Sequence, residues 1–292
     1  MELAQQGILD EETKLARYVT FSIIEKNAVP EALKALSAAI NSPETVVGLG
    51  NSCITALGAN ITGLKVMPAQ CSAGIEIPSI PEALWIWIRG NDRGEIFHRS
   101  RLIEKHLSSA FAVTSIVDSF QYDENRDMSG YIDGTENPVG TDAVDAAIIA
   151  DGEQGQTGSS FVAVQQWLHN FEDLDRMSTE EKDNTIGRHI SDNEEFDAPT
   201  SAHVKRSAQE NFEPEAFMLR RSMPWVDGLD GGLIFVSFVR TLDTFEAIMD
   251  RMIGKDDGVV DALFNFTRPI NGAYYWCPPV KDGKLDLSAL GI

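Results

Sequence analysis

The order of apolar and polar positions in the first part of the chain alternates between strand-like and helical patterns. Runs rich in β-branched and aromatic residues predict strands, and apolar residues three and four positions apart predict helices. Pro30 favours a helix start, and the glycines within residues 45–57 favour a bent strand. The predicted elements are a strand at 18–24, a helix at 31–40, a bent strand at 45–57, a strand at 84–88, a helix at 92–107 and a strand at 111–120.

The second part of the chain repeats this element order without repeating the residues themselves. Ser178 and Glu181 have the spacing of a capping box at a helix start. The predicted elements are a strand at 160–168, a helix after the capping box, strands at 217–222 and 233–239 around a glycine turn at 227–232, a helix at 242–253 and a strand at 273–276. This repetition predicts an α+β protein of tandem, duplicated ferredoxin-like units with antiparallel sheets. We place the units at residues 1–142 and 143–292.

Composition and charge narrow the class of protein. The chain has 292 residues, of which 43% are hydrophobic, and this is enough for a sizeable core. Its net charge of −21 argues against nucleic acid and anionic membrane surfaces, because both attract basic proteins. The amino terminus shows no signal-peptide pattern, and no apolar run is long enough to span a bilayer, so we expect a cytoplasmic protein. Three widely separated cysteines form no metal-ligand spacing, and Cys277 is expected to be a buried free thiol.

Residues 130–138, with the sequence Gly-Tyr-Ile-Asp-Gly-Thr-Glu-Asn-Pro, form the most distinctive stretch of the chain. Gly130 and Gly134 permit backbone angles that other residues avoid, or let a flat ligand approach the main chain closely. In that case Asp133 is held at a fixed point against the ligand. The alternative is an ordinary surface turn, since Asp-Gly is a common turn dipeptide.

A long segment of little periodicity, residues 188–214, is a candidate functional loop. It contains His203, one of five histidines in the chain, followed closely by two cations. Arg188 at the start of the loop and the arginines at 220 and 221 add positive charge. A histidine among cations is a plausible place for a ligand that bears carboxylates, although a single histidine is more often structural.

The stretch 130–138, the Ala-His pair at 202–203 and the Arg-Arg-Ser-Met-Pro stretch at 220–224 together resemble the dye-decolourising peroxidases, in particular their compact bacterial B-type branch. The resemblance covers nearly the whole chain. It implies a duplicated ferredoxin-like fold, one haem b in the second half, and reduction of hydrogen peroxide with oxidation of dyes or small aromatic electron donors.

The resemblance also assigns roles to individual residues. It makes His203 the proximal ligand of the haem iron, and Asp133 and Arg220 the pair that acts on peroxide on the distal side. Neighbouring strand residues point to opposite faces, so only one of Arg220 and Arg221 can reach the haem. The match to the family's Arg-x-Ser/Asn-Met-Pro pattern favours Arg220, and Arg221 is then expected in a surface or interface salt bridge. The remaining residues implied in haem binding are Arg188, at a propionate, together with Ser222, Ile132, Gly134 and Thr135.

Several interpretations stay open at this point. Asp261 is the candidate carboxylate partner of His203, although spacing alone does not establish the pair. The main alternative function is a haem protein for storage, transfer or iron release, and a further one is a ferredoxin-like dimer without cofactor. We expect a homodimer or larger homo-oligomer, and the apolar C-terminal tail gives weak support for docking inside an encapsulin shell, with a frayed end as the alternative.

The aromatic residues have two interpretations. Trp85 and Trp87 alternate on a predicted strand and are expected in the core. The aromatic residues of the second half either pack in the core and around haem or relay electrons at the surface; they are Trp167, Trp225, Trp276, Tyr274 and Tyr275.

Overall fold

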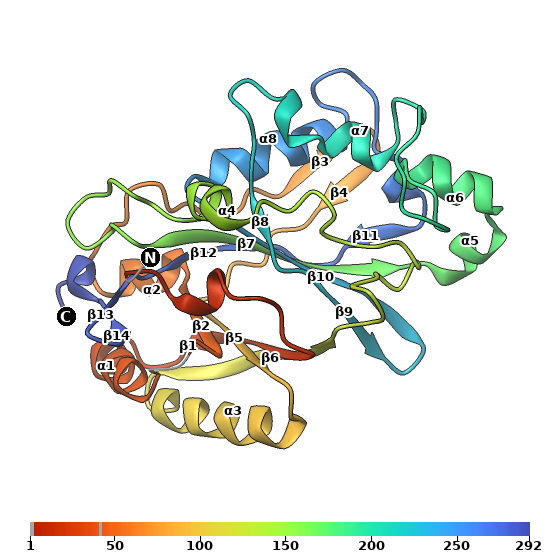
Figure 1. The fold of residues 1–292 in the computed structure, drawn as a ribbon. Helices are drawn as coiled ribbons and strands as arrows, with labels where there is room; N and C mark the ends of the chain where they lie inside the picture. Colours follow the sequence, from red (N-terminus) through yellow and green to blue (C-terminus); the bar gives the residue numbers. More distant parts are fainter. Residues whose placement is uncertain (1–2, 41–42) are drawn as a thin grey trace.

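Ten strands form one sheet in which the paired neighbours run antiparallel (Figure 1). The computed structural model describes residues 3–40 and 43–292. The strands of the first half are β1 (Leu15–Ile23), β2 (Thr45–Leu49), β5 (Leu84–Gly90) and β6 (Phe111–Phe120). Those of the second half are β7 (Ser160–His169), β8 (Leu219–Arg220), β9 (Met223–Asp227), β10 (Asp230–Val239), β11 (Thr267–Pro269) and β12 (Ala273–Cys277). Two small hairpins stand apart, β3 (Gln70–Ser72) with β4 (Ile75–Ile77), and β13 (Val280–Lys281) with β14 (Lys284–Leu285).

The two halves share one spatial strand order. In the first half the order is β2-β5-β1-β6, and in the second it is β9-β10-β7-β12, so each half places its second, third, first and fourth main strands side by side. This order confirms the predicted tandem ferredoxin-like units. The halves join where Leu49 of β2 pairs with Trp276 of β12 and where Ser119 of β6 pairs with Trp225 of β9. The boundary after residue 142, which falls within α4, stays a prediction.

Helices cover the strands on two sides. In Figure 1, α1 (Val29–Ala39) and α3 (Arg93–Leu107) lie at the bottom of the view, α7 (His203–Ser207) and α8 (Leu242–Met252) lie at the top, and α5 (Phe171–Arg176) and α6 (Thr179–Ile186) lie at the right. The longest of these helices, α1, α3 and α8, turn apolar residues such as Leu36, Leu107 and Met249 toward the core. The helices are α1 (Val29–Ala39), α2 (Asn51–Ala56), α3 (Arg93–Leu107), α4 (Gly140–Ala147), α5 (Phe171–Arg176), α6 (Thr179–Ile186), α7 (His203–Ser207) and α8 (Leu242–Met252).

A second apolar cluster lies where strands of both halves face each other. Tyr18, Trp85 and Trp87 of the first half stack with one another, and Tyr275 and Phe238 of the second half lie within 5.9–6.4 Å of these rings. Trp85 and Trp87 are at most 1% exposed, which confirms their prediction as core residues. These aromatic contacts hold the two units together.

Three predicted elements differ from the structure. Residues 45–57 are not one bent strand: β2 ends at Leu49 and α2 follows, because Gly50 takes an extended conformation as the N-cap and α2 buries Cys53 and Ile54. The predicted strand at 217–222 is only two residues long, and β9 was missed after it. The turn is also shorter than predicted, around Gly228 with φ of +60°, because β10 already begins at Asp230. The capping box of Ser178 and Glu181 is confirmed at the start of α6.

The carboxyl end of the chain packs against its own core. Leu285, Leu287 and Leu290 are each at most 8% exposed, so the interpretation of a frayed end is wrong. Docking in an encapsulin shell stays a prediction, and a shell that binds these leucines must first displace them from the core. Cys277 is confirmed as a buried free thiol.

Candidate functional site

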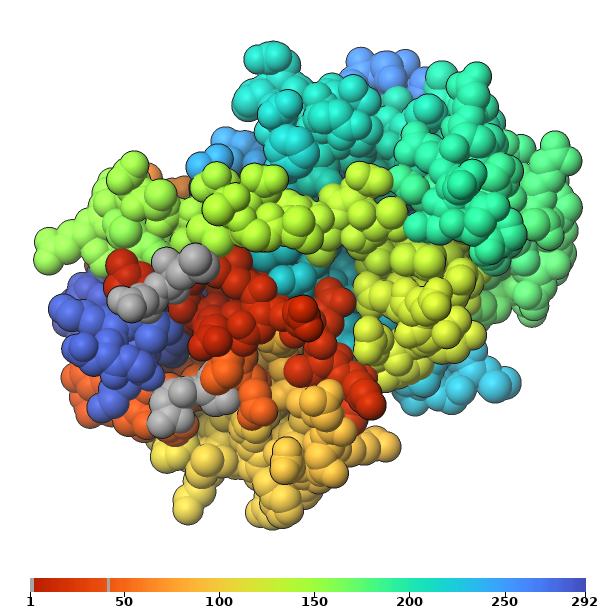
Figure 2. Space-filling model, in the orientation of Figure 1, coloured from red at the N-terminus to blue at the C-terminus, as the bar shows by residue number. Residues whose placement is uncertain are grey.

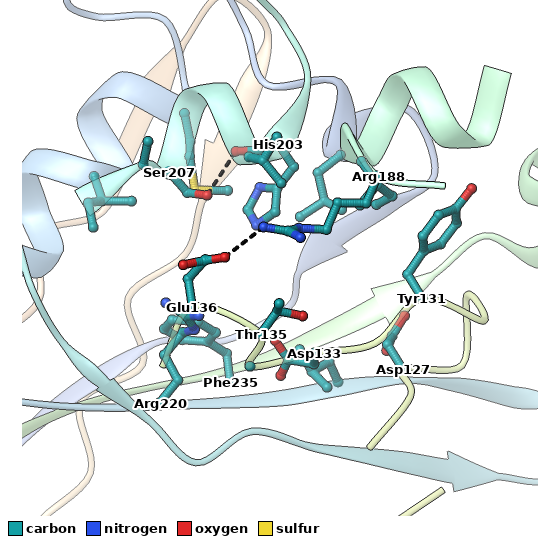
Figure 3. A pocket seen from close by; sticks show the side chains of 18 of the residues that line it. Asp127, Tyr131, Asp133, Thr135, Glu136, Arg188, His203, Ser207, Arg220 and Phe235 are labelled. Atoms are coloured by element: carbon teal, nitrogen blue, oxygen red, sulfur yellow. Dashed lines mark hydrogen bonds and ion pairs between the residues drawn. The ribbon is translucent and has the colours of Figure 1, made fainter. Parts of the chain in front are cut away.

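A cavity of about 380 Å³ lies in the second half of the chain. Its walls come from α7 and α8, from β7 and β10, and from the loop of residues 127–136 that carries Asp133. In Figure 2 the yellow-green segment that includes this loop crosses the face between the red N-terminal segment and the green segment that precedes α7. The predicted site residues that line the cavity are His203, Arg188, Ile132, Asp133, Gly134, Thr135 and Arg220 (Figure 3).

His203 is held by a buried carboxylate. It is the first residue of α7, and its Nδ1 lies 2.8 Å from Oδ2 of Asp261, which confirms the predicted pair. Asp261 is 1% exposed, and its Oδ1 accepts the N–H of Leu263 at 2.8 Å. Burial alone lowers the pKa of His203, but the charge and hydrogen bond of Asp261 outweigh it and raise the pKa. Because Nδ1 is engaged with Asp261, Nε2 is the ring nitrogen left to bind a ligand.

Asp133 lies on the opposite wall of the cavity from His203 (Figure 3). Gly130 and Gly134 have φ of +93° and +83°, which confirms that the loop needs glycine on both sides of the aspartate. The backbone N–H of Asp133 donates to the carbonyl of Asn125 at 2.9 Å. Burial raises the pKa of the Asp133 carboxyl, and the charge of Asp127 raises it further, whereas the charge of Arg220 lowers it. The net rise makes Asp133 easier to protonate than a free aspartate.

Arg220, the last residue of β8, and Arg221, the residue after it, point to different sides of the chain, as strand alternation predicts. Arg220 lines the cavity, whereas the guanidinium of Arg221 donates to the carbonyls of Ile8 and Leu9, both at 3.1 Å, and lies 3.8 Å from Glu12. Its side chain is 12% exposed. Arg221 therefore anchors the N-terminal segment. The expected salt bridge is present, with Glu12, but both side chains are mostly buried rather than at the surface.

Ser222 does not line the cavity. It is 4% exposed, and its hydroxyl lies 3.4 Å from the N–H of Val236 in β10. Ser222 therefore has no direct contact with the cavity: β8 ends at Arg220, and the Ser222 hydroxyl, which lies between β8 and β9, turns toward β10.

Arg188 links two walls of the cavity. Its Nη2 lies 2.8 Å from Glu136, which follows the Asp133 loop, and 3.2 Å from Glu195, while Nη1 donates to the carbonyl of Asn193 at 3.0 Å. Asn193 also donates from its side chain to the hydroxyl of Thr135 at 3.0 Å. Figure 3 shows the Arg188–Glu136 pair between His203 and the Asp133 wall. This position puts a cation at the margin of the cavity, where an anionic ligand group can meet it.

Sequence reasoning missed two polar anchors beside Asp133. Asp127 and His169 both line the cavity and form an ion pair, with Nε2 of His169 at 3.0 Å from both carboxylate oxygens. The hydroxyl of Tyr131 donates to Asp183 of α6 at 2.6 Å. No sequence spacing signals either pair, because the partners are 42 and 52 residues apart.

The aromatic residues of the second half are buried. Trp167 lines the cavity, and its backbone carbonyl accepts the indole N–H of Trp225 at 2.9 Å. Trp167, Trp225, Trp276, Tyr274 and Tyr275 are each at most 6% exposed. Burial favours their interpretation as packing residues, so a relay of electrons at the surface would need other side chains.

The residues of the cavity fit a haem. The lining also includes apolar side chains, among them Met218, Phe235 and Met249, which suit a flat apolar macrocycle. Across residues 3–40 and 43–292, no three His, Cys, Asp or Glu side chains form a group able to hold a metal ion by themselves. A single carboxylate-oriented histidine suffices when a porphyrin supplies the other ligands.

Within residues 3–40 and 43–292, no helix is long and apolar enough to cross a membrane.

Comparison with known proteins agrees with this site. Residues 124–282, more than half of the chain, match the family described as "Dyp-type peroxidase, C-terminal". The chain is 28% identical over 298 residues to a dye-decolorizing peroxidase of Rhodococcus erythropolis, and the match covers 94% of this chain and 86% of that protein. For three further curated relatives, the match covers between 59% and 66% of their length.

Solved structures agree in fold as well. A dye-decolorizing protein from V. cholerae matches with a TM-score of 0.86 and 27% identity over 98% of both chains. A variant of DypB from Rhodococcus jostii RHA1 in complex with heme matches with a TM-score of 0.83 and 25% identity, over 94% of this chain and 96% of that one. On the family match and on a cavity that combines an oriented histidine with an acid and an arginine, the chain belongs to the Dyp-type peroxidase family of haem enzymes.

Proposed function

We propose that the cavity binds one haem b and that the protein reduces hydrogen peroxide at the expense of a dye or small aromatic electron donor. The observation that supports this most strongly is the placement of His203, backed by Asp261, across the cavity from Asp133 and Arg220. In this proposal Nε2 of His203 is the iron ligand, and Ile132, Gly134 and Thr135 pack near the macrocycle. Arg188 meets a propionate.

Haem, when bound, would supply the redox chemistry: it would give electrons to peroxide and regain them from the electron donor. Asp133 moves the proton: its carboxylate accepts it from one peroxide oxygen and returns it to the other, which leaves as water. Such general acid–base groups contribute about 10²–10⁴-fold to a rate. Arg220 stabilises the negative charge that develops on the departing oxygen, and it keeps Asp133 partly ionised despite burial. Asp261 holds the His203 ring in one orientation and raises its basicity.

The alternative is a haem protein for storage, transfer or iron release. His203 and Arg188 suit both functions, but a carrier has no use for an acid and an arginine on the wall opposite its iron ligand. Asp133 and Arg220 therefore favour the peroxidase.

The two functions separate in one experiment. Arg220→Ala and Asp133→Ala should retain haem but react more slowly with peroxide in stopped-flow absorbance measurements. Removal of one charge-stabilising donor lowers such rates by about 10²–10³-fold. Wild-type rates in both variants, with haem fully bound, would favour the carrier.

We also propose that the protein forms a homodimer through β6. Within the described residues, β6 pairs with β1 along its length but with β9 only at Ser119, so most of its outer edge is open. Residues 113–116 are exposed, and residues 111–117 carry no charge, which limits repulsion between two copies of a chain with net charge −21. Antiparallel pairing of two copies about this centre places Val113 opposite Ile116 and Thr114 opposite Ser115, so apolar meets apolar and polar meets polar.

A further inference from the structure

The hairpin of residues 125–133 carries two carboxylates into the cavity. Asp133 ends the hairpin, and its N–H donates to the carbonyl of Asn125 at 2.9 Å. Asp127 lies near its start, and its N–H donates to the carbonyl of Tyr131 at 2.8 Å, while the N–H of Gly130 returns to the Asp127 carbonyl at 2.9 Å. Because these hydrogen bonds make the hairpin one structural unit, a contact that holds Asp127 in position also holds Asp133 in position.

Asp127 is tied to the sheet by His169. The carboxylate also accepts the N–H of Ser129 at 2.9 Å, which orients it within the hairpin. His169 is the last residue of β7, is 7% exposed, and bonds through Nδ1 to the hydroxyl of Thr267 in β11 at 2.7 Å. The rings of Phe171 and Phe266 meet the imidazole edge-on at 5.9 and 5.6 Å. These contacts hold the imidazole ring of His169 in place, and through it they attach the hairpin to β7 and β11.

Both ring nitrogens of His169 contact polar groups. Nδ1 lies 2.7 Å from the hydroxyl of Thr267, which lies 3.2 Å from the carbonyl oxygen of Leu168, and Nε2 lies 3.0 Å from both carboxylate oxygens of Asp127. Burial alone raises the pKa of Asp127, but hydrogen bonds from His169 and Ser129 and the charge of His169 lower it on balance, so this carboxylate is ionised. Because an ionised carboxylate only accepts hydrogen bonds, Nε2 of His169 donates to it.

We propose that Asp127 and His169 are positioning residues for Asp133: they anchor its hairpin, and the hydrogen bond from His169 offsets part of the negative charge of Asp127, which lies on the same hairpin as Asp133. The inference rests on the proposed role of Asp133 in the peroxide reaction. Two consequences follow. Loss of the pair loosens the hairpin, and it changes the charge that Asp133 experiences, in a direction that depends on which partner is removed.

The test compares His169→Gln and Asp127→Asn in the haem-loaded protein, with His98→Gln on the exposed side of α3 as the matched control. Amide hydrogen exchange measures how firmly the hairpin of residues 125–133 is held in place. A charge-assisted hydrogen bond contributes about 1.5–3 kcal/mol, so the amides of residues 127, 130 and 133 should exchange about ten- to hundredfold faster in His169→Gln. In Asp127→Asn, which keeps the shape of the side chain, the increase in the exchange rate should be smaller than in His169→Gln. In His98→Gln the exchange rate should equal that of the wild type.

The pH profile of the peroxide reaction measures the effect of the nearby charge on Asp133. In His169→Gln the Asp127 carboxylate is no longer offset, so the acid limb of the profile should move to higher pH. In Asp127→Asn that carboxylate is gone, and the limb should move to lower pH. Damage to the fold alone does not produce opposite shifts, and haem absorbance per chain should stay at the wild-type level in both variants.

Two results would overturn the proposal: wild-type amide exchange in His169→Gln, or pH limbs that stay in place or move in the same direction. If His169→Gln does not fold, the shift in Asp127→Asn decides. If Asp133→Asn reacts with peroxide as fast as wild type, the proposed role of Asp133 is wrong, while the exchange data still decide whether His169 anchors the hairpin.

Discussion

The side-chain amide of Asn137 brackets the backbone of Arg220. Its Oδ1 accepts the N–H of Arg220 at 2.8 Å, and its Nδ2 donates to the carbonyl of Arg220 at 2.7 Å. Asn137 belongs to the same short stretch as Asp133, so one segment of chain presents the acid and also fixes the strand that carries the arginine. The geometry of Asp133 and Arg220 is therefore set locally, although the two residues are far apart in the sequence.

This contact predicts that Asn137→Ala impairs the peroxide reaction without loss of haem. With both hydrogen bonds gone, the two-residue strand β8 loses its tie to the loop and Arg220 loses its fixed position. We expect a peroxide reaction about tenfold slower, which corresponds to about 1.4 kcal/mol and lies within the range for the loss of two hydrogen bonds of about 0.5–1.5 kcal/mol each. Stopped-flow absorbance gives the rate. A wild-type rate in Asn137→Ala would show that Arg220 is positioned by other contacts.

Haem retention tests the histidine. His203→Ala should abolish or severely reduce haem binding, because no other histidine on the cavity wall has a nitrogen to spare: both nitrogens of His169 are engaged. Asp261→Asn should still bind haem, but with lower affinity, since a group that hydrogen-bonds to a metal-binding histidine typically contributes about 10- to 100-fold to metal affinity. The measurement is haem absorbance per chain, followed by transfer to an excess of a haem-scavenging globin. Full haem with a histidine-ligated spectrum in His203→Ala would refute the assignment.

The pH dependence of the reaction should reflect Asp133. Burial raises its pKa, and Asp133 takes up a proton from peroxide only when ionised. The rate should therefore fall as pH decreases through this pKa, at a higher pH than for a free aspartate with its pKa of about 3.9. Asp133→Asn should be slow at every pH and lack this acid limb. Stopped-flow rates of the peroxide reaction between pH 4 and 8 test this prediction. An acid limb that persists in Asp133→Asn would belong to another titrating group.

Part of this molecule was predictable from sequence because local patterns carry it. The strands and long helices follow apolar periodicity, and the motif residues Asp133, His203 and Arg220 sit in short recognisable stretches. The helix α2 was missed because alternating apolar residues and glycines suit a strand equally well, and only burial of Cys53 and Ile54 distinguishes the two.

The polar anchors of the site were not predictable because they are tertiary contacts. Asp127 and His169 look like unrelated surface residues in the sequence, and nothing local to either one indicates the other. The direction of Ser222 depends on whether β8 continues into β9 or breaks after Arg220. It breaks, and that break placed the Ser222 hydroxyl toward β10 rather than in the cavity.

Asp183 should stabilise the fold in a pH-dependent way. Burial raises its pKa, but hydrogen bonds from Tyr131, His189 and the N–H of Ile190 outweigh this and lower it. A carboxylate with a lowered folded-state pKa stabilises fully above its unfolded pKa of about 3.9, and this contribution is lost as pH falls through the folded value. Asp183→Asn should therefore reduce the free energy of unfolding by about 1–3 kcal/mol at pH 7 and by less near pH 3. Urea unfolding measures both, with Asp175→Asn on the exposed face of α5 as the control.

A deficit in Asp183→Asn that does not shrink with acid would mean that packing, and not the charge, is responsible. An unchanged stability at pH 7 would mean that the Tyr131 hydroxyl finds another partner.

The open edge of β6 gives the last prediction. In the proposed dimer Ile116, which is 51% exposed, packs opposite Val113 of the second copy. Ile116→Lys inserts a charge twice into this interface, once from each copy, and the edge then resists pairing as natural edge strands with lysine do. Light scattering at micromolar concentration should show a dimer for the wild type and a monomer for Ile116→Lys. Leu229→Lys, at a turn residue that is 97% exposed and far from β6 in sequence, serves as the control and should remain dimeric. A monomeric wild type would refute the dimer itself, whereas a dimer that survives Ile116→Lys would place the interface elsewhere on the surface.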